Sequence, residues 1–582
     1  MRAKETLMMT IADYVAEQLA DRGVDTAFEL VGGMITHLLD ALYRGNRVRV
    51  VSMHHEQGAA FAAEGWARMK RGVPGVALAT SGPGATNLLT AIGSCYFDSI
   101  PAVFITGQVN VNEQKGESGV RQLGFQETDI VAMAAPVTKW AVGVQSPGEV
   151  GRVLDHAFRC ALEGRPGPVL IDLPMNVQRA EWTGAGSCST RIDDAAENAP
   201  SQDSPEQGRE FLTCLNDALL LAKHPLVLAG GGVRSALAEK HALALLERLG
   251  VPVVTSLMGV DLLPAGHPLR VGMIGTYGNR WANWALEHAD LVLALGSRFD
   301  VRQTGADLAS FTRGKTFFQV DVDAAELNNR VLVQHALCMP LQEWFDLEAA
   351  APLDAWNGGE QWLGDIRAME AKWPDTDEAA GVGGIDPNVL VRQVSGASPQ
   401  AGSFVSDVGQ HQMWAAQSVR LRGGQRLLNS GGMGAMGFAL PAAIGACVAS
   451  GRPSVVFSGD GSVQLNIQEL QTIRTHGLPV KIIVMNNGAY GMVRQFQEAY
   501  FGERYQSTVW GYEAPDFVRI AEAYGIPALR VEKREELTDA LARLWEDPAA
   551  PFLLNVAIEQ KRNAYPKTMF GQPLSRMEPA KP

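Results

Sequence analysis

Cysteine is scarce in this chain, with six in 582 residues, and none of the six forms a C-x-x-C pair. A structural zinc site or a disulfide framework is therefore not expected, and the cysteines are interpreted as free thiols. Positive charge is also in deficit, with 50 Lys and Arg against 63 Asp and Glu, a net charge of −13. This deficit weighs against nucleic acid as a partner, because binding the phosphate backbone needs clustered Lys and Arg. The composition predicts a cytoplasmic protein.

Long apolar runs are missing as well. The N-terminal stretch MRAKETLMMTIADYVAEQLADRG carries charges throughout and is typical of an amphipathic helix, not of a signal peptide. The one long uncharged stretch, residues 431–450, consists mostly of Gly and Ala with Pro441 inside it. It lacks the Leu and Ile content of a membrane-spanning helix, so no membrane segment is expected.

What the sequence does contain is a regular alternation of short apolar runs and helical patterns. Runs such as VALAT (76–80), LVLAL (291–295) and SVVFS (454–458) suit strands buried on both faces of a parallel sheet. The alternation predicts an α/β fold with three domains, each a mostly parallel central sheet flanked by helices. Polar stretches at 183–208 and 351–386 are interpreted as linkers between domains at 1–182, 209–350 and 387–582. The first and third domains share the βα pattern and could be related sheets.

Two polar clusters follow strands in the third domain. The strand 454–458 leads into Gly459-Asp460-Gly461-Ser462, and the strand 481–485 leads into Asn486-Asn487-Gly488. Ligands of open α/β sheets bind at the carboxyl ends of strands, and the glycines permit close approach of a phosphate. Asp460 and Asn487 offer hard oxygen ligands of the kind that Mg²⁺ takes when it bridges to phosphate.

A lone G-D-G-S is more often a simple turn, but the Asn-Asn cluster follows at the spacing of the thiamine diphosphate (ThDP) motif. The chain resembles ThDP-dependent enzymes, specifically the acetohydroxyacid synthase (acetolactate synthase) catalytic subunits, over nearly its whole length. The resemblance implies a pyrimidine-binding first domain, an FAD-binding-like central domain and a diphosphate- and Mg²⁺-binding third domain. Asp460, Asn487 and the carbonyl of Ala489 would hold the metal. The other implied ThDP contacts of the third domain are Val408, Gly409, Gln410, His411, Gly434, Met436, Gly459, Gly461, Ser462, Gly491 and Met492.

Activation of ThDP needs a carboxylate against the pyrimidine ring, placed in an apolar helix where burial favours a shared proton. Glu56 follows a short strand and opens the apolar stretch EQGAAFAAEGWAR, in which Glu64 is the second candidate. The pattern H-E-Q-G-A-A-x-A-A-E-G resembles that of the synthases and selects Glu56. The resemblance further implies ThDP contacts from Gly82, Pro83 and Asn87, and a catalytic set of Gly33, Glu56, Gln126 and Lys139.

The middle domain has a strand followed by three glycines, LVLAGGGV (226–233), which alone is weak evidence for a nucleotide site. Its flanking segments resemble the FAD-binding elements of the synthases, where the flavin is structural. Ile274, Val301 and Pro340 stand at positions where the resemblance is broken. The implied FAD contacts are Gly230, Gly231, Gly232, Ser256, Leu257, Met258, Gly275, Arg298 and Asp321.

The reaction implied by the resemblance is decarboxylation of pyruvate and transfer of its two-carbon unit to a second carbonyl, with 2-acetolactate as the expected product. Arg302 would clamp the carboxylate of the acceptor, and Phe496 stands where the synthases carry a Trp that selects it. Because of that departure, transfer to a nucleotide-linked keto sugar or another ketone stays open, as do plain decarboxylation and a paralogue without turnover. The resemblance also implies a homodimer or homotetramer with active sites between subunits. A regulatory subunit is possible but not indicated.

Overall fold

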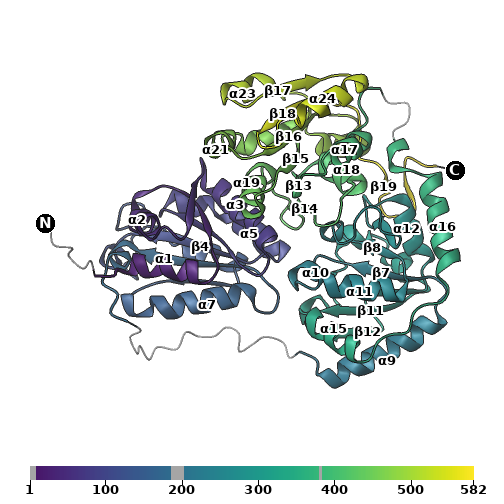
Figure 1. Cartoon of the computed structure of the whole chain (residues 1–582), viewed down its shortest axis with the longest axis horizontal. Helices are drawn as coiled ribbons and strands as arrows, with labels where there is room; N and C mark the ends of the chain where they lie inside the picture. Colours follow the sequence, from purple (N-terminus) through teal and green to yellow (C-terminus); the bar gives the residue numbers. More distant parts are fainter. Residues whose placement is uncertain (1–7, 185–201, 379–382, 582) are drawn as a thin grey trace.

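The computed structural model describes residues 8–184, 202–378 and 383–581 of the chain. These residues form three six-stranded sheets, and neighbouring strands run parallel in all three (Figure 1). The predicted three-domain α/β fold is confirmed. Among the described helices, none is long and apolar enough to span a membrane.

The first sheet has the strand order β2-β1-β3-β4-β6-β5. Its central strands are buried along their whole length, as expected for continuous apolar runs that are covered on both faces. The strands are β1 (Thr26–Leu30), β2 (Arg49–Ser52), β3 (Gly75–Ala79), β4 (Ala102–Gln108), β5 (Trp140–Gly143) and β6 (Pro168–Pro174). The helices are α1 (Ile11–Asp21), α2 (Thr36–Gly45), α3 (Glu56–Lys70), α4 (Pro83–Asn87), α5 (Leu89–Asp98), α6 (Ile130–Ala134), α7 (Val150–Leu162) and α8 (Met175–Gln178).

The third sheet has the order β14-β13-β15-β16-β18-β17, which is the order of the first sheet when strands are counted from the start of each domain. The two domains therefore share one topology. The strands are β13 (Ser403–Ser406), β14 (Arg426–Asn429), β15 (Ser454–Gly459), β16 (Val480–Asn486), β17 (Ala528–Val531) and β18 (Phe552–Ala557). The helices are α17 (Pro387–Gly396), α18 (Gln410–Ser418), α19 (Ala439–Ser450), α20 (Asp460–Val463), α21 (Glu469–His476), α22 (Gly491–Tyr500), α23 (Phe517–Ala523) and α24 (Leu537–Leu544). A small antiparallel pair, β19 (Lys567–Thr568) and β20 (Met577–Glu578), follows.

The middle sheet has a different order, β12-β11-β10-β7-β8-β9. Counted within the domain and from its other edge, this is the 3-2-1-4-5-6 order of dinucleotide-binding sheets, with the switch point between β7 and β10. The strands are β7 (Pro225–Ala229), β8 (Val253–Thr255), β9 (Arg270–Met273), β10 (Leu291–Leu295), β11 (Thr316–Asp321) and β12 (His335–Cys338). The helices are α9 (Pro205–Leu221), α10 (Gly232–Ser235), α11 (Glu239–Leu249), α12 (Arg280–His288), α13 (Val301–Thr304), α14 (Leu308–Thr312), α15 (Leu341–Ala350) and α16 (Gly359–Lys372).

The segments expected to be linkers are partly structured. Residues 351–386 contain α16, whose Trp362 and Ile366 are buried in the core of the middle domain. In the first expected linker, α9 begins at Pro205, behind a capping box formed by Ser204 and Gln207, and residues 185–201 lie outside the described part. These stretches are expected to be linkers because their composition is polar. Two buried apolar side chains are nevertheless enough to attach a helix to a core.

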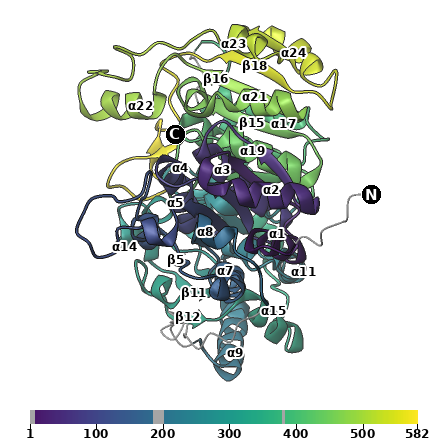
Figure 2. The same ribbon diagram turned by 90° about the vertical axis from the view of Figure 1, so that its left-hand side faces the viewer.

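The first and third domains are joined through α3 and α19, which lie side by side in both views (Figures 1 and 2). Both helices are buried along most of their length within a single apolar core that includes strands of both sheets. The helices approach so closely that a Cβ atom built at Gly445 would lie 1.8 Å from the carbonyl oxygen of Ala62. The expected apolar character of α3 therefore reflects a domain interface and not only the surroundings of Glu56.

Candidate active site

The third sheet brings the predicted metal ligands together at the carboxyl ends of its central strands. Asp460 follows β15 and Asn487 follows β16, its parallel neighbour. Asp460 is 1% exposed, and its Oδ2 accepts a hydrogen bond of 2.7 Å from the hydroxyl of Tyr512. The side-chain amide of Asn487 donates to Oε1 of Gln410 at 3.3 Å, and the backbone N–H of Ala489 donates to Oδ1 of Asn487 at 3.2 Å. Burial raises the pKa of Asp460 to about 6, and a bound cation would favour its charged form.

At two positions around this cluster, a side chain on a glycine would require a neighbouring side chain to move. A Cβ atom at Gly461 would lie 2.4 Å from the ring of Tyr490, and one at Gly491 would lie 2.0 Å from Oε1 of Gln410. The backbone can therefore approach a ligand closely here. His411 adds a polar atom, since its buried Nε2 has no hydrogen-bond partner among the described residues. Burial lowers the pKa of His411 to about 3, so the ring is neutral and Nε2 is available to a phosphate oxygen.

The remaining predicted ThDP contacts of this domain lie nearby. Val408, Gly409 and Gln410 follow β13, which lies next to β15, and the hydroxyl of Ser462 donates to the carbonyl of Val408 at 2.9 Å. Gly434 and Met436 lie on the connection between β14 and α19. Met492 accepts a weak hydrogen bond at its sulfur from the hydroxyl of Tyr277 in the middle domain. These residue types suit a bound diphosphate and its metal.

Sequence reasoning missed Asp407, the residue that organises this edge. Its buried carboxylate accepts hydrogen bonds from the backbone N–H groups of Val408, Gly437 and Ala439, at 2.8, 2.9 and 3.1 Å. Burial raises the pKa of Asp407 to about 6. It follows a buried strand directly, so the reasoning that selected Asp460 applies to it equally.

The first sheet presents a second polar edge. Glu56 begins α3, is 8% exposed, and accepts a 3.0 Å hydrogen bond at Oε2 from the side-chain amide of Asn87. Gly82 and Pro83 begin the short helix that carries Asn87, and Gly33 follows β1, the neighbour of β3. Gln126 approaches the same loop, because a Cβ at Gly82 would lie 3.0 Å from that of Gln126. These predicted residues thus occupy one edge of the sheet.

Lys139 does not join them. It precedes β5, at the amino-terminal edge of the parallel sheet, whereas Glu56 follows the carboxyl end of β2. Its Nζ donates to the backbone carbonyl of Glu163 at 2.6 Å, and burial lowers its pKa. A strand separates the two edges, so within one chain Lys139 is not brought to Glu56.

The middle sheet contributes a large cavity at its switch point. Gly230 and Gly232 follow β7 and donate backbone hydrogen bonds to Leu295 and Gly296 at the end of β10, at 2.9 and 3.0 Å. The cavity measures about 1010 Å³ and is bounded by all three domains. Seven of the predicted FAD contacts line it: Gly231, Gly232, Ser256, Leu257, Met258, Arg298 and Asp321. Gly230 and Gly275 are not among the lining residues.

The three residues at which the resemblance to the FAD-binding elements is broken also lie on this cavity. Ile274, Val301 and Pro340 line it, as does Arg302. No carboxylate of the described residues forms an ion pair with Arg302, although its backbone is fixed by a 2.7 Å hydrogen bond from Thr276 N to its carbonyl. Phe496 lies on α22, is 53% exposed, and packs against Tyr500 and Phe501. The cavity is therefore formed of residues that can hold a dinucleotide, with a free guanidinium at its wall.

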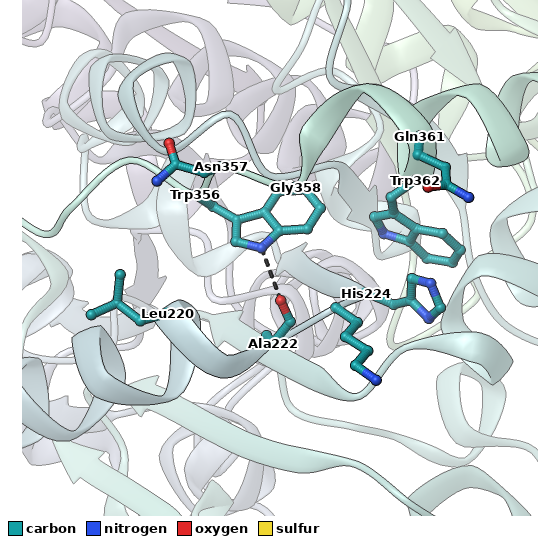
Figure 3. A pocket seen from close by; sticks show the side chains of 9 residues that line it. Leu220, Ala222, His224, Trp356, Asn357, Gly358, Gln361 and Trp362 are labelled. Carbon is teal, nitrogen blue, oxygen red and sulfur yellow. Dashed lines mark hydrogen bonds between the residues drawn. The ribbon is translucent and has the colours of Figure 1, made fainter.

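A smaller cavity of about 420 Å³ lies at the opposite, amino-terminal end of the middle sheet (Figure 3). Two indole rings line it, and their N–H groups are satisfied: Trp356 donates to the carbonyl of Ala222 at 3.0 Å and Trp362 to that of Pro225 at 3.2 Å. The ring of His224 packs on Trp362 with centroids 4.4 Å apart. The contacts of Trp362 attach α16 to the domain, and that of Trp356 attaches the segment just before this helix.

Comparison with known proteins agrees with this arrangement. Three family models match the chain: the N-terminal TPP-binding domain of thiamine pyrophosphate enzymes at residues 9–133, their central domain at 212–345, and their C-terminal TPP-binding domain at 407–556. The chain belongs to the thiamine pyrophosphate enzymes. Thiamine pyrophosphate is the same compound as ThDP, and the cofactor expected from the G-D-G and Asn-Asn clusters is thereby confirmed.

Individual relatives narrow the family further. The chain is 36% identical to the acetolactate synthase large subunit of Lactococcus lactis, over 96% of the chain and 94% of the relative. It is also 36% identical to the acetolactate synthase isozyme 2 large subunit of Escherichia coli K12, over 98% and 99%, and to acetolactate synthase 3, chloroplastic, of Brassica napus, over 96% and 85%. The protein is thus a ThDP-dependent enzyme of the acetolactate synthase family, which forms carbon–carbon bonds.

Proposed function

We propose that the protein is a cytoplasmic enzyme that decarboxylates pyruvate and transfers the two-carbon unit to a second pyruvate, giving 2-acetolactate and CO₂. The observation that carries this proposal is the convergence of Asp460, Asn487 and the unsatisfied His411 at one sheet edge. That donor set suits a diphosphate held through a divalent metal ion. Its relatives are named for acetolactate formation.

The roles of the residues follow from their chemistry. Asp460, the amide oxygen of Asn487 and the carbonyl of Ala489 would hold Mg²⁺, because all three are hard oxygen ligands. No group of three His, Cys, Asp or Glu side chains suited to a metal occurs in the described part of the chain. The metal site therefore depends on amide and carbonyl oxygens beside one carboxylate, together with the oxygens of the diphosphate.

ThDP, when bound, supplies the carbanion chemistry of the reaction. Glu56 would hold a proton at Oε1, since Asn87 already donates to Oε2 and no described residue forms a hydrogen bond with Oε1. The rigid α3 fixes that carboxylate, and Gly82 and Gln126 would shape the space beside it. The task of this edge is to orient the pyrimidine ring and share its proton.

We further propose that Glu56 serves the third domain of a second copy of this chain. Among the described residues, no hydrogen bond joins Glu56 to Asp460 or Asn487 of its own chain. Large apolar side chains are exposed beside both edges: Phe125 is 80% and Phe570 80% exposed, and Val493 on α22 is 52% exposed. A homodimer, or a homotetramer of such dimers, would cover these side chains and complete the site.

We also propose that the middle cavity holds FAD. Its position at a 3-2-1-4-5-6 switch point, its volume of about 1010 Å³ and its glycine-rich wall support a dinucleotide there. Purified protein should be yellow and should release FAD on denaturation. Colourless protein that takes up no FAD would show that Ile274, Val301 and Pro340 have changed the site.

Product analysis tests the main proposal. Protein supplied with ThDP, Mg²⁺ and pyruvate should form acetolactate, detected by mass spectrometry, and Asp460→Ala should form none and lose its Mg²⁺-dependent affinity for ThDP. Wild-type protein that consumes pyruvate only when a keto sugar or another ketone is added would contradict the choice of acceptor.

A further inference from the structure

The loop of residues 430–434, here called the glycine loop, follows β14, contains Gly434 and leads to Met436, and both of these residues are predicted ThDP contacts. It is held by a different domain of the same chain. The backbone N–H of Gly431 donates to Oδ2 of Asp98 at 2.9 Å, and that of Gly432 donates to Oδ1 at 2.7 Å. Asp98 is the last residue of α5 in the first domain. One carboxylate therefore binds two consecutive N–H groups of the loop with both of its oxygens.

Helix α5 supports the glycine loop at further points. The hydroxyl groups of Ser94 and Ser430 are 3.3 Å apart. The side chain of Met433 lies 3.4 Å from the place of a Cβ at Gly93. A Cβ at Gly432 would lie 2.6 Å from the Cβ of Phe97, so a side chain there would push the loop away from α5. Gln412 also donates to the carbonyl of Ser430 at 3.1 Å, so α5 is one of the elements that fix the shape of the loop.

Asp98 is itself fixed in a buried position. Its side chain is 1% exposed and pairs with Nη2 of Arg68 at 3.0 Å, and Arg68 also pairs with Glu64. Burial raises the pKa of Glu64. Hydrogen bonds to a buried, ionised group are stronger and more strictly oriented than those between neutral groups. The Arg68–Asp98 pair therefore gives the glycine loop little freedom to change shape.

We propose that Asp98 is a positioning residue for the cofactor: it holds the glycine loop in the conformation that presents Gly434 and Met436 to ThDP. The proposal rests on the ThDP function given above. Its physical basis is preorganisation, because a loop that is already ordered loses less entropy when the ligand binds. In this arrangement each chain orders its own cofactor loop through α5, while its Glu56 faces the cofactor of a second copy.

The chain offers a matched control in Asp261. This buried carboxylate also joins domains, since it pairs with Arg234 of the middle domain and with Arg426 of the third. It also accepts a backbone hydrogen bond, from Leu427 N at 3.1 Å. Leu427 lies in β14, three residues before the glycine loop, and no hydrogen bond of Asp261 among the described residues reaches the loop. Arg426 also donates to the backbone carbonyl of Arg68 at 2.7 Å, a contact that does not involve the guanidinium that pairs with Asp98. Asp261→Asn should therefore lower stability as Asp98→Asn does without touching the loop.

The experiment is calorimetric titration of ThDP, with Mg²⁺ present, into wild-type protein, Asp98→Asn, Asp261→Asn and Gly432→Ala. Asp98→Asn should weaken ThDP binding about tenfold or more, the scale of a lost hydrogen bond to a charged group. Gly432→Ala should act in the same direction without changing any charge, which keeps the test open if Asp98→Asn does not fold. Asp261→Asn should bind ThDP as wild-type protein does. Saturating ThDP should restore much of the turnover of Asp98→Asn, because binding and not chemistry is affected.

Two outcomes would overturn the proposal while the proposed function stands. One is unchanged ThDP affinity in Asp98→Asn and Gly432→Ala beside tight wild-type binding. The other is an equal loss of affinity in Asp261→Asn, which would assign the effect to domain packing. If wild-type protein bound no ThDP, the proposed function itself would fail, and this proposal with it.

Discussion

At the scale of single residues, a short polar side chain after a buried strand is the recurring feature of the site. Asp407, Asp460 and Asn487 each follow a strand of the third sheet, and each is buried. A buried polar group is stable only if it is paired, and the backbone N–H groups of the adjoining loops supply the partners for Asp407. These residues shape loops as well as bind ligands.

Substitution of Arg302 tests whether the acceptor carries a carboxylate. If the acceptor is a second keto acid, Arg302→Ala should weaken its use by about 1.5–3 kcal/mol, roughly 10- to 150-fold in acceptor-limited rate. The rate at which the donor pyruvate is decarboxylated should hardly change, because this step precedes acceptor binding. The measurement is the carboligation rate against acceptor concentration with the donor saturating. An unchanged acceptor dependence would contradict a carboxylate clamp.

Asp172 on β6 provides a test of pH dependence. Its buried carboxylate accepts from Thr106 Oγ1 at 2.7 Å and Gln108 Nε2 at 2.8 Å, and faces the charge of Asp129. Burial raises its pKa from 3.8 to about 7. The unfolded chain therefore loses this proton at lower pH than the folded protein does. The contribution of protonated Asp172 to the free energy of unfolding is therefore complete below about pH 4. It decreases as the pH rises to about 7, by up to ~4 kcal/mol at ~1.4 kcal/mol per pKa unit.

Asp172→Asn should remove this dependence, so that its melting temperature relative to wild type rises between pH 4 and pH 8. Thermal unfolding across that range is the measurement. The exposed Asp365 on α16 serves as the control, and Asp365→Asn should keep the wild-type profile. A constant difference between Asp172→Asn and wild type would show that Asp172 is not protonated in the folded protein near neutral pH.

At the scale of elements, the crossing of α3 and α19 decides how the first and third domains meet. The two helices approach at glycines, and the surrounding side chains form one continuous core. A packed interface of this kind tolerates little added volume.

Two glycine substitutions separate packing from helix propensity. Gly445→Ala would place a Cβ 1.8 Å from the carbonyl of Ala62 and should destabilise the protein by about 1–3 kcal/mol or more. Gly364→Ala, on the exposed face of α16 with nothing within 4 Å, should stabilise it by about 0.5–1 kcal/mol. Denaturant unfolding measures both. Equal effects would mean that the interface between α3 and α19 accommodates the added methyl group.

At the scale of the whole molecule, three sheets surround one cavity, and two of the sheets share a topology. The first and third domains each present a polar edge, but each edge carries only half of the proposed ThDP site. In a dimer, the first domain of one chain and the third domain of the other can together form a complete site, and two such sites result.

Complementation of two inactive variants tests this arrangement. Glu56→Gln and Asp460→Ala should each be inactive alone. When both are produced together, half of the dimers are mixed and contain one site with both residues intact, so about a quarter of wild-type activity should return. Turnover of the co-produced protein, and of the purified mixed dimer, which should reach about half of wild-type activity, is the measurement. If both residues of a site came from one chain, no site of the mixed dimer would be intact and activity would stay absent.

The sequence alone determined the parallel sheets, because its short continuous apolar runs alternate with helical patterns, and it indicated the Asp460–Asn487 site, because each residue directly follows such a run at the spacing of the ThDP motif. Gly82, Asn87 and Glu56 could likewise be predicted to share an edge. These inferences needed only local chemistry and the resemblance carried by short motifs.

Tertiary structure alone decided the rest. Lys139 lies at the opposite sheet edge because its position before a strand, and not its residue type, fixes its place. Helix α16 belongs to the middle domain because Trp362 is buried there, although its neighbourhood is polar in composition. The hydrogen bonds that Gly431 and Gly432 donate to Asp98 join residues of two domains more than 300 positions apart. No pattern in the chain encodes such a pair, since only the packing of whole domains brings its two halves together.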